Sequence, residues 1–117
     1  LPQMVCKTLV ARGPGGHYVF VLPVTGELDR KKAAALVGEK SLEMLHVKDL
    51  LAVTGYVRGG CTALGMKKQF PTVVEQSLRE KPFIYVSGGK RGLQLKLAPG
   101  DLVQAAGAMW GDVLAKN

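Results

Sequence analysis

A lysine occupies an unusual place in the first apolar segment of this 117-residue chain. Residues 5–10 read Val-Cys-Lys-Thr-Leu-Val, a composition typical of a β-strand, and a period of two puts Val5, Lys7 and Leu9 on one face. A lysine that lines an apolar cavity stabilises developing negative charge strongly, because the local dielectric constant is low. The alternative is a lysine of an edge strand whose ammonium reaches water, and the strand pattern taken alone favours that alternative.

Two glycine-rich segments could present backbone N–H groups to an anionic ligand. Gly59-Gly60 and Gly65 bracket a loop that also contains Cys61, and glycine lets a ligand approach the main chain closely. The segment Ser87 to Gly92 (SGGKRG) follows an expected strand and combines a hydroxyl, backbone donors and two cations, a set that suits phosphate recognition. A basic, glycine-rich hairpin turn has the same composition, so composition does not separate the two interpretations.

The residue sets of the common hydrolases are missing from the sequence. It contains no Gly-x-Ser-x-Gly elbow, no His-Glu-x-x-His pair and no Walker-type glycine loop. Cys6 and Cys61 have no Cys or His at metal-ligand spacing, and two cysteines are too few for a disulfide-stapled secreted domain. We therefore expect two free thiols in a reducing cytoplasm, with a single Cys6–Cys61 bridge as the alternative, and no bound metal and no cofactor.

Composition favours a single domain over residues 1–117 with a polyanionic partner. Lysine and arginine number 16 against 9 aspartates and glutamates, a formal charge of +7, and 47% of the residues are hydrophobic. No run approaches the roughly 18 apolar residues of a membrane-spanning helix. The cations gather in Arg30-Lys31-Lys32, Lys67-Lys68 and Lys90-Arg91, which suit nucleic acid better than a membrane, although each cluster could simply be solvated surface.

The elements expected to position these residues mix short strands and short helices. Residues 5–10 and 18–24 predict a hairpin, Asp29 and Gly38 are expected to cap a helix over residues 30–37, and Leu93, Leu95 and Leu97 are expected on one face of a strand over 92–97. Further strands are expected at 41–46, 70–74 and 83–86, and the segment 56–65 is expected to be a strand that enters a glycine-bounded loop. Further helices are expected at 47–53 and 102–108, the latter capped near 99–101 and followed by a packed tail around residues 110–114. This order predicts an α+β domain whose mixed sheet of six or seven strands is curled or partly closed.

Taken together, these segments resemble the YbaK/EbsC-type aminoacyl-tRNA deacylases, which are related to the editing domain of bacterial prolyl-tRNA synthetases. The resemblance runs from Gln3 to about Ala105 in the family's order and spacing. It is carried by five stretches: Lys7-Thr8-Leu9, Leu28 to Lys32, Thr54 to Gly60, Leu64 to Lys68, and Tyr85 to Gly92. The last of these, with its Val-Ser-Gly-Gly-Lys-Arg-Gly run, is the most specific.

The resemblance implies a trans-editing enzyme that hydrolyses the ester between a wrong amino acid, cysteine or alanine, and the 3′ end of a tRNA for proline. The acceptor end of the tRNA would be the partner, and a prolyl-tRNA synthetase a further candidate partner. Lys7 and Gly59 would be catalytic, and the substrate would be bound by Thr8, Gly60, Cys61, Gly65, Ser87, Gly88, Gly89, Lys90 and Arg91. An aminoacyl ester is already activated, so positioning by a lysine and backbone donors can replace a nucleophile of the protein.

The sequence departs from the family pattern in three places. Ala63 stands where the glycine loop has proline, and Gln94 stands where an acidic residue follows the Lys-Arg-Gly stretch. Relatives also carry further elements before the Lys-Thr-Leu strand, which predicts either a truncated chain or a more open site. The alternatives to the editing enzyme are a non-catalytic module that binds tRNA or another phosphorylated ligand, and an enzyme for another small ester or amide. The preferred amino acid, the preferred tRNA and the oligomeric state do not follow from the sequence.

Overall fold

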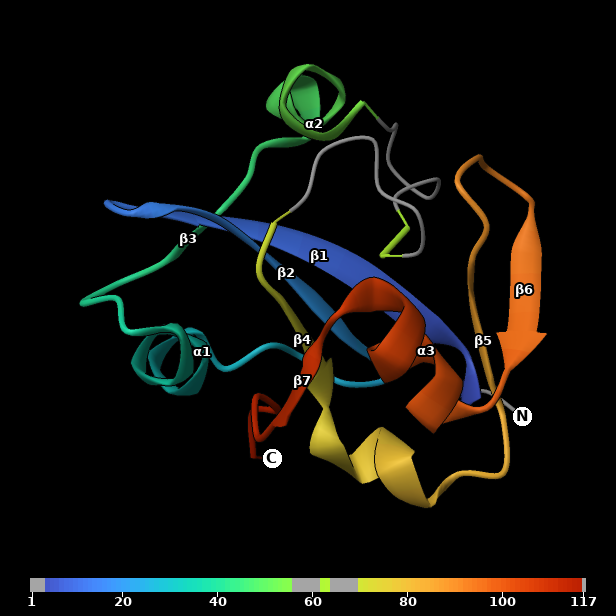
Figure 1. Ribbon diagram of the computed structural model, residues 1–117. Coiled ribbons are helices and arrows are strands. Elements are labelled where there is room, and N and C mark those ends of the chain that lie inside the picture. The colour runs from blue at the N-terminus through green and yellow to red at the C-terminus, as the bar shows by residue number, and fades with distance from the viewer. Residues whose placement is uncertain (1–3, 56–61, 64–69, 117) are drawn as a thin grey trace.

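The computed structural model describes residues 4–55, 62–63 and 70–116, and these fold into two sheets with short helices around them (Figure 1). One sheet has five strands in the order β3-β1-β2-β4-β7, and the other pairs β5 with β6. The strands are β1 (Cys6–Gly13), β2 (Gly16–Pro23), β3 (Glu43–Met44), β4 (Thr72–Glu75), β5 (Ile84–Ser87), β6 (Gln94–Leu97) and β7 (Met109–Gly111). The helices are α1 (Arg30–Val37), α2 (Val47–Thr54), α3 (Pro99–Ala106) and the 3-10 helix η2 (Gln76–Glu80).

The predicted hairpin is confirmed as the long central pair of the larger sheet. β1 and β2 run antiparallel in register from Cys6 opposite Pro23 to Gly13 opposite Gly16. β4 then joins β2 in parallel, and β7 joins β4 in parallel, so the sheet is mixed. The predicted α+β class is therefore confirmed. Over the part of the chain that the structure describes, this sheet is open rather than closed, with β3 and β7 as its edge strands.

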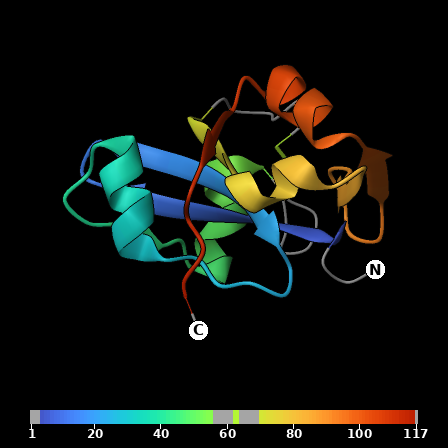
Figure 2. The same ribbon diagram turned by 90° about the horizontal axis from the view of Figure 1, so that it is seen from below.

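Each face of the hairpin builds its own hydrophobic core, because alternate residues of a strand point to opposite sides. Val10, Val19 and Val21 belong to the first hydrophobic cluster, which also contains side chains of β4, β5, η2 and α3. Ala11, Phe20 and Leu22 belong to the second hydrophobic cluster, which Ala33 and Ala34 of α1 cover. Figures 1 and 2 show α1 at one end of the hairpin and the β5–β6 pair at the other.

Helix α1 is held at both ends by the residues that the sequence predicts as caps. The Asp29 carboxylate accepts hydrogen bonds from the backbone N–H groups of Lys31 and Lys32 at 3.0 and 3.1 Å. Gly38 ends the helix with φ = 79°, a left-handed conformation that a residue with a Cβ adopts at a cost. A helix of eight residues is too short to be stable by itself, so its caps and its alanine face hold it against the sheet.

Replacing Asp29 by alanine should destabilise the domain by about 1 kcal/mol, because two N–H groups at the helix start lose their acceptor. Urea unfolding followed by circular dichroism measures this as a lower midpoint with an unchanged slope. Asp29→Asn keeps an acceptor oxygen and should stay within about 0.5 kcal/mol of the unmodified protein. An alanine variant as stable as the unmodified protein would contradict the capping role.

Several boundaries predicted from the sequence are wrong. The strand expected at 41–46 is only Glu43–Met44, and the strand expected at 70–74 lies at Thr72–Glu75. The last helix begins at Pro99 with Ala98 at its N-cap position, three residues before the predicted start, and ends at Ala106. Residues 109–111 form β7 rather than a packed tail, because they pair with β4, a non-local partner that local patterns do not reveal.

Two further expectations concern the second sheet and the segment around residues 56–65. The strand expected at 92–97 is Gln94–Leu97. Of the three leucines expected on one face, Leu97 packs against the first hydrophobic cluster, whereas Leu93 and Leu95 are 40% and 39% exposed. The strand expected at 56–65 lies mostly outside the described residues. None of the helices within residues 4–55, 62–63 and 70–116 is long and apolar enough to cross a membrane.

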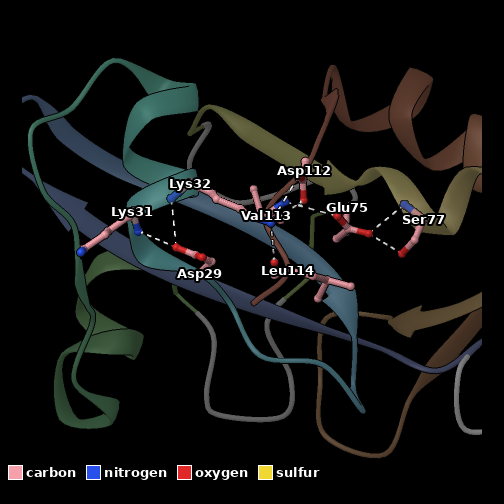
Figure 3. Close-up of polar contacts among 8 residues, drawn as sticks. All are labelled: Asp29, Lys31, Lys32, Glu75, Ser77, Asp112, Val113 and Leu114. Carbon is pink, nitrogen blue, oxygen red and sulfur yellow. Dashed lines mark hydrogen bonds and ion pairs between the residues drawn. The ribbon is translucent and has the colours of Figure 1, made fainter. Parts of the chain in front are cut away.

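The C-terminal segment after β7 is tied to the body by polar contacts that Figure 3 shows together. Glu75, which is 2% exposed, accepts a hydrogen bond from the Val113 N–H at 3.2 Å and further bonds from the N–H and the hydroxyl of Ser77. Lys32 of α1 contacts the Asp112 carboxylate at 3.2 Å and donates to the Leu114 carbonyl at 3.0 Å. These contacts fasten α1, β4 and residues 112–114 to one another.

Candidate functional site

A cavity of about 530 Å³ lies where the N-terminal end of β1 meets the β5–β6 pair. β1 and the β5–β6 hairpin contribute to its wall, together with Val5 and the residue that follows β2. Its lining residues are Val5, Cys6, Lys7, Thr8, Leu9, Val24, Ser87, Gly92, Leu93 and Gln94. The fold therefore brings Lys7, Thr8 and Ser87, three of the predicted site residues, to one hollow from opposite ends of the sequence.

The cavity exists because β1 changes its neighbour along its outer edge. Val5, just before β1, forms a parallel bridge with Tyr85 of β5, and further along Ala11 and Arg12 pair with β3. Between these two pairings, the outer edge of β1 borders the cavity. Residues from both faces of β1 therefore contribute to the lining, and Thr8 lies beside Lys7 although the two side chains point to opposite sides.

Lys7 lies at the border between the second hydrophobic cluster and the cavity. It pairs across the hairpin with buried Leu22, and Leu9 on the same face packs against the cluster under α1. The Lys7 side chain is 25% exposed, and its ammonium lies 4.0 Å from the carboxylate of Glu27, whose side chain is 85% exposed. Such a loose, solvated ion pair holds its partners weakly, so an incoming anionic group can replace the carboxylate.

The Ser87 to Gly92 segment is the turn between β5 and β6. Ser87 and Gly92 line the cavity, whereas Gly88, Gly89, Lys90 and Arg91 do not contribute to the lining described by the structure. The turn is closed by the N–H of Gly88, which donates to the Leu93 carbonyl at 2.8 Å. Gly88 also needs to be glycine, because a Cβ there would lie 2.6 Å from Cγ of Leu93. The hairpin interpretation of this segment is thus confirmed, and its role in binding stays a prediction.

Gly59, Gly60, Cys61 and Gly65, the other predicted site residues, lie outside the described residues. Thr62 and Ala63, between them, are 3% and 4% exposed. Ala63 belongs to the first hydrophobic cluster. The residue that departs from the family pattern at this position therefore fills core space.

Cys6 lines the cavity but is a poor nucleophile. Burial raises the pKa of its thiol to about 12, so the thiol stays protonated at neutral pH. Its side chain packs against the first hydrophobic cluster, on the face of β1 opposite Lys7. Within residues 4–55, 62–63 and 70–116, no group of three or more His, Cys, Asp or Glu side chains is placed to hold a metal ion.

A second hollow of about 520 Å³ lies next to the C-terminal segment and has a different character. Lys32, Glu75 and Asp112 are among its lining residues, and all three bind other parts of the chain. These three charged groups are used to hold the fold together. The cavity at Lys7 is therefore the better candidate for chemistry.

Pattern reasoning missed several residues of the site. Glu27 reaches Lys7 from the loop after β2, a contact that no spacing in the sequence indicates. Val24 and Leu93 supply apolar wall and are 46% and 40% exposed, which marks them as surface around a hollow. Gln94 lines the cavity because it pairs with Ser87 across the β5–β6 ladder. For Gln94, the sequence did contain a signal, because the alternation of residues 92–97 puts Gln94 on the strand face opposite the leucines.

The structure is an α+β domain in which a lysine and a glycine-rich hairpin border a mostly apolar cavity. These features agree with the family to which the sequence is matched. The model of the aminoacyl-tRNA editing domain matches residues 1–105. The chain belongs to this family of aminoacyl-tRNA editing domains.

One curated relative and two solved structures illustrate the similarity. The chain is 46% identical over 114 residues, 97% of its length and 70% of the relative's, to a protein of Enterococcus faecalis named "Putative Cys-tRNA(Pro)/Cys-tRNA(Cys) deacylase EbsC". A crystal structure described as "a putative trans-editing enzyme for prolyl tRNA synthetase" matches with a TM-score of 0.91 and 26% identity, over 99% of this chain and 73% of that one. A scaffold protein used for computational epitope grafting matches with a TM-score of 0.92 and 27% identity, over 98% and 76% of the two chains.

Proposed function

We propose that this chain is a trans-editing aminoacyl-tRNA deacylase that hydrolyses the ester of a mischarged tRNA. The observation that carries the proposal is the meeting of Lys7 and Ser87 at one cavity, within a chain of the aminoacyl-tRNA editing family. The +7 charge of the chain suits a tRNA substrate. The relative named as a Cys-tRNA(Pro)/Cys-tRNA(Cys) deacylase supports cysteinyl-tRNA as the first substrate to test.

In the proposed reaction, a nucleophile adds to the ester carbonyl and the bond from the acyl carbon to the ribose oxygen breaks. The leaving ribose oxygen takes up the proton that the nucleophile loses. The nucleophile is a water molecule for an alanyl ester, and the thiol of the substrate itself for a cysteinyl ester. In the cysteinyl case the first product is a cyclic thioester, which water then opens to give free cysteine. Lys7 stabilises the negative charge that develops on the carbonyl oxygen, and Ser87 and the backbone around the cavity orient the acyl group.

The cavity suits a small acyl group. Four apolar side chains, Val5, Leu9, Val24 and Leu93, face it together with the polar groups of Thr8, Ser87 and Gln94. A mostly apolar wall with a few polar groups is the usual composition of a small-molecule site. A prolyl-tRNA synthetase remains the proposed partner that would deliver mischarged tRNA.

A panel of charged tRNAs tests the proposal. We expect the protein to release amino acid from Cys-tRNA(Pro) or Ala-tRNA(Pro) and to leave Pro-tRNA(Pro) intact. If the substrate thiol is the nucleophile, Cys-tRNA(Pro) should be cleaved at least tenfold faster than Ser-tRNA(Pro), because a hydroxyl ionises far less readily than a thiol. Acid-precipitable radiolabelled amino acid measures both rates.

The Cys6→Ala variant is the control for chemistry by the protein's own thiol. It should keep its rate within about twofold, because a thiol with a pKa near 12 contributes no thiolate at neutral pH. Binding of tRNA that weakens steeply with salt, without any release of amino acid, would favour the non-catalytic module instead. Equal cleavage of all charged tRNAs, Pro-tRNA(Pro) included, would contradict an editing role.

A further inference from the structure

The face of β1 that carries Lys7 continues onto the β5–β6 pair. Val5 bridges Tyr85 in parallel, and Tyr85 lies opposite Lys96 in the antiparallel ladder. Paired residues of neighbouring strands point to the same side of a sheet, and so do residues two positions apart on one strand. Val5, Tyr85 and Lys96 therefore form a row across three strands, on the side to which Lys7 points.

A second row runs beside the first and forms part of the cavity wall. Ser87 lies opposite Gln94 in the ladder, and both line the cavity with Lys7. Ser87 follows Tyr85 by two residues, a step of about 6.6–6.8 Å along a strand. The cavity is thus adjoined, on the same face, by an aromatic side chain and a lysine.

A third side chain completes this neighbouring surface. The rings of Phe83 and Tyr85 meet edge to face at 5.6 Å between centroids and an angle of 85°. The ammonium of Lys96 lies 4.1 Å from the centroid of the Phe83 ring. We call these three residues, Phe83, Tyr85 and Lys96, the aromatic ribbon face. Figure 1 shows the β5–β6 pair that carries it at one edge of the molecule, beside the N-terminal end of β1.

The charge of the surrounding segment is uniformly positive. From Lys81 to Gly100 the sequence contains Lys81, Lys90, Arg91 and Lys96 and no aspartate or glutamate. Half-buried aromatic rings interleaved with cations are the usual platform for unpaired nucleotides, whose bases stack on the rings while the cations meet the phosphates. A protein partner would call for a larger apolar patch, and an RNA duplex would offer the rings no base to stack on.

We propose that the aromatic ribbon face binds the unpaired nucleotides at the 3′ end of the tRNA that precede the esterified nucleotide. This inference rests on the proposed function for the position of the ester, at Lys7 and Ser87. With the ester there, the next nucleotide lies one strand step away, over Tyr85, and its phosphate meets the ammonium of Lys96. The surface gives affinity for the tRNA and takes no part in breaking the ester.

Fluorescence anisotropy with a labelled single-stranded RNA that ends in CCA tests the binding directly. Tyr85→Leu should weaken binding by roughly tenfold or more, because one stacked base is lost, whereas Tyr85→Phe should bind within about twofold of the unmodified protein. Lys96→Met should weaken binding and lower the slope of log K against log salt by about 0.7, the value for one phosphate contact on a single strand. Lys31→Met, on α1 at the other end of the molecule in Figure 1, removes the same charge and should leave the slope unchanged.

Kinetics with a mischarged tRNA separate binding from chemistry. Tyr85→Leu should raise KM by roughly tenfold and leave kcat within about twofold, because stacking on this face is the same in the ground state and the transition state. Thermal unfolding of each variant shows that the fold is intact, and the recovery of binding in Tyr85→Phe excludes a merely structural effect.

The two proposals fail separately. Unchanged RNA binding by Tyr85→Leu and Lys96→Met, in a protein that cleaves mischarged tRNA, would overturn the binding surface and leave the deacylase. RNA binding that depends on Tyr85 and Lys96, in a protein that cleaves no charged tRNA, would support the surface and overturn the deacylase. Equal losses in Tyr85→Leu and Lys31→Met would also overturn the surface, since they would mean attraction by overall charge alone.

Discussion

Replacing Lys7 by methionine should reduce deacylation by at least a hundredfold and leave the fold intact. Methionine keeps the length and the apolar stem of the lysine side chain and removes only the ammonium. In the proposed reaction that ammonium stabilises the oxyanion, and loss of one such donor lowers kcat by roughly 10²–10³ in other hydrolases. Because Lys7 is 25% exposed and its ion pair with Glu27 is loose, the free energy of unfolding should change by less than about 1 kcal/mol.

The matched control lies on the same strand. Arg12→Met also removes a cation of β1 and an ion pair, the 3.4 Å contact with Glu43, but at the end of the strand far from the cavity. Its kcat/KM should fall by no more than the few-fold effect of one charge on tRNA attraction. Single-turnover release of amino acid, with protein in excess, measures the chemical step in both variants. Full activity in Lys7→Met would contradict the proposed mechanism.

The position of Lys7 was predictable, but its surroundings were not. Alternation along residues 5–10 puts Lys7 with Val5 and Leu9, and the structure keeps that arrangement because a strand fixes side chains to a period of two. Alternation does not say what covers a face. Here α1 covers the far part of it, packing on Ala11 and Leu9, and the near end borders the cavity. From the sequence alone, Lys7 could therefore line an apolar cavity or lie on an exposed edge strand.

Contacts between distant segments account for most of what sequence reasoning missed. The parallel pairing of β4 with β7 and the approach of Glu27 to Lys7 join residues with no local pattern in common. The cap at Asp29 and the hairpin were predictable because their partners are a few residues away, or because a turn sequence joins them. Composition pointed to Ser87, but only the resemblance to a family supplied Thr8 and placed the two residues in one site.

Glu75 is a buried charged residue of the core, and its replacement by alanine should destabilise the domain by about 2–4 kcal/mol. One carboxylate oxygen accepts from the Val113 N–H, and the other accepts from the N–H and the hydroxyl of Ser77. Removing a buried acceptor leaves each donor without its partner at a cost of about 1–3 kcal/mol per group. The truncation also leaves a cavity, because the Glu75 residue is only 2% exposed.

Glu80 provides the control for this substitution, since it has an exposed side chain and lies at the end of the 3-10 helix η2, whose N-cap residue is Glu75. Glu80→Ala should change the free energy of unfolding by less than about 0.5 kcal/mol. Urea unfolding, monitored by circular dichroism with both variants at one pH, gives the two values. Equal midpoints for Glu75→Ala and Glu80→Ala would contradict the role of the buried carboxylate.

Glutamine at position 75 separates hydrogen bonding from packing. Glu75→Gln keeps the volume but offers one acceptor oxygen and one NH₂ group to partners that are all donors, so an N–H would face an N–H on one side. We expect a loss of about 1–3 kcal/mol, smaller than for alanine by the cavity contribution. The loss should be seen first as faster hydrogen exchange at Val113, because the Glu75 carboxylate joins β4 to the C-terminal segment. Unchanged hydrogen exchange at Val113 in both variants would mean that other contacts hold this segment without Glu75. These contacts are the 2.8 Å hydrogen bond from the Asp29 N–H to the Val113 carbonyl and the contacts of Lys32 with Asp112 and Leu114.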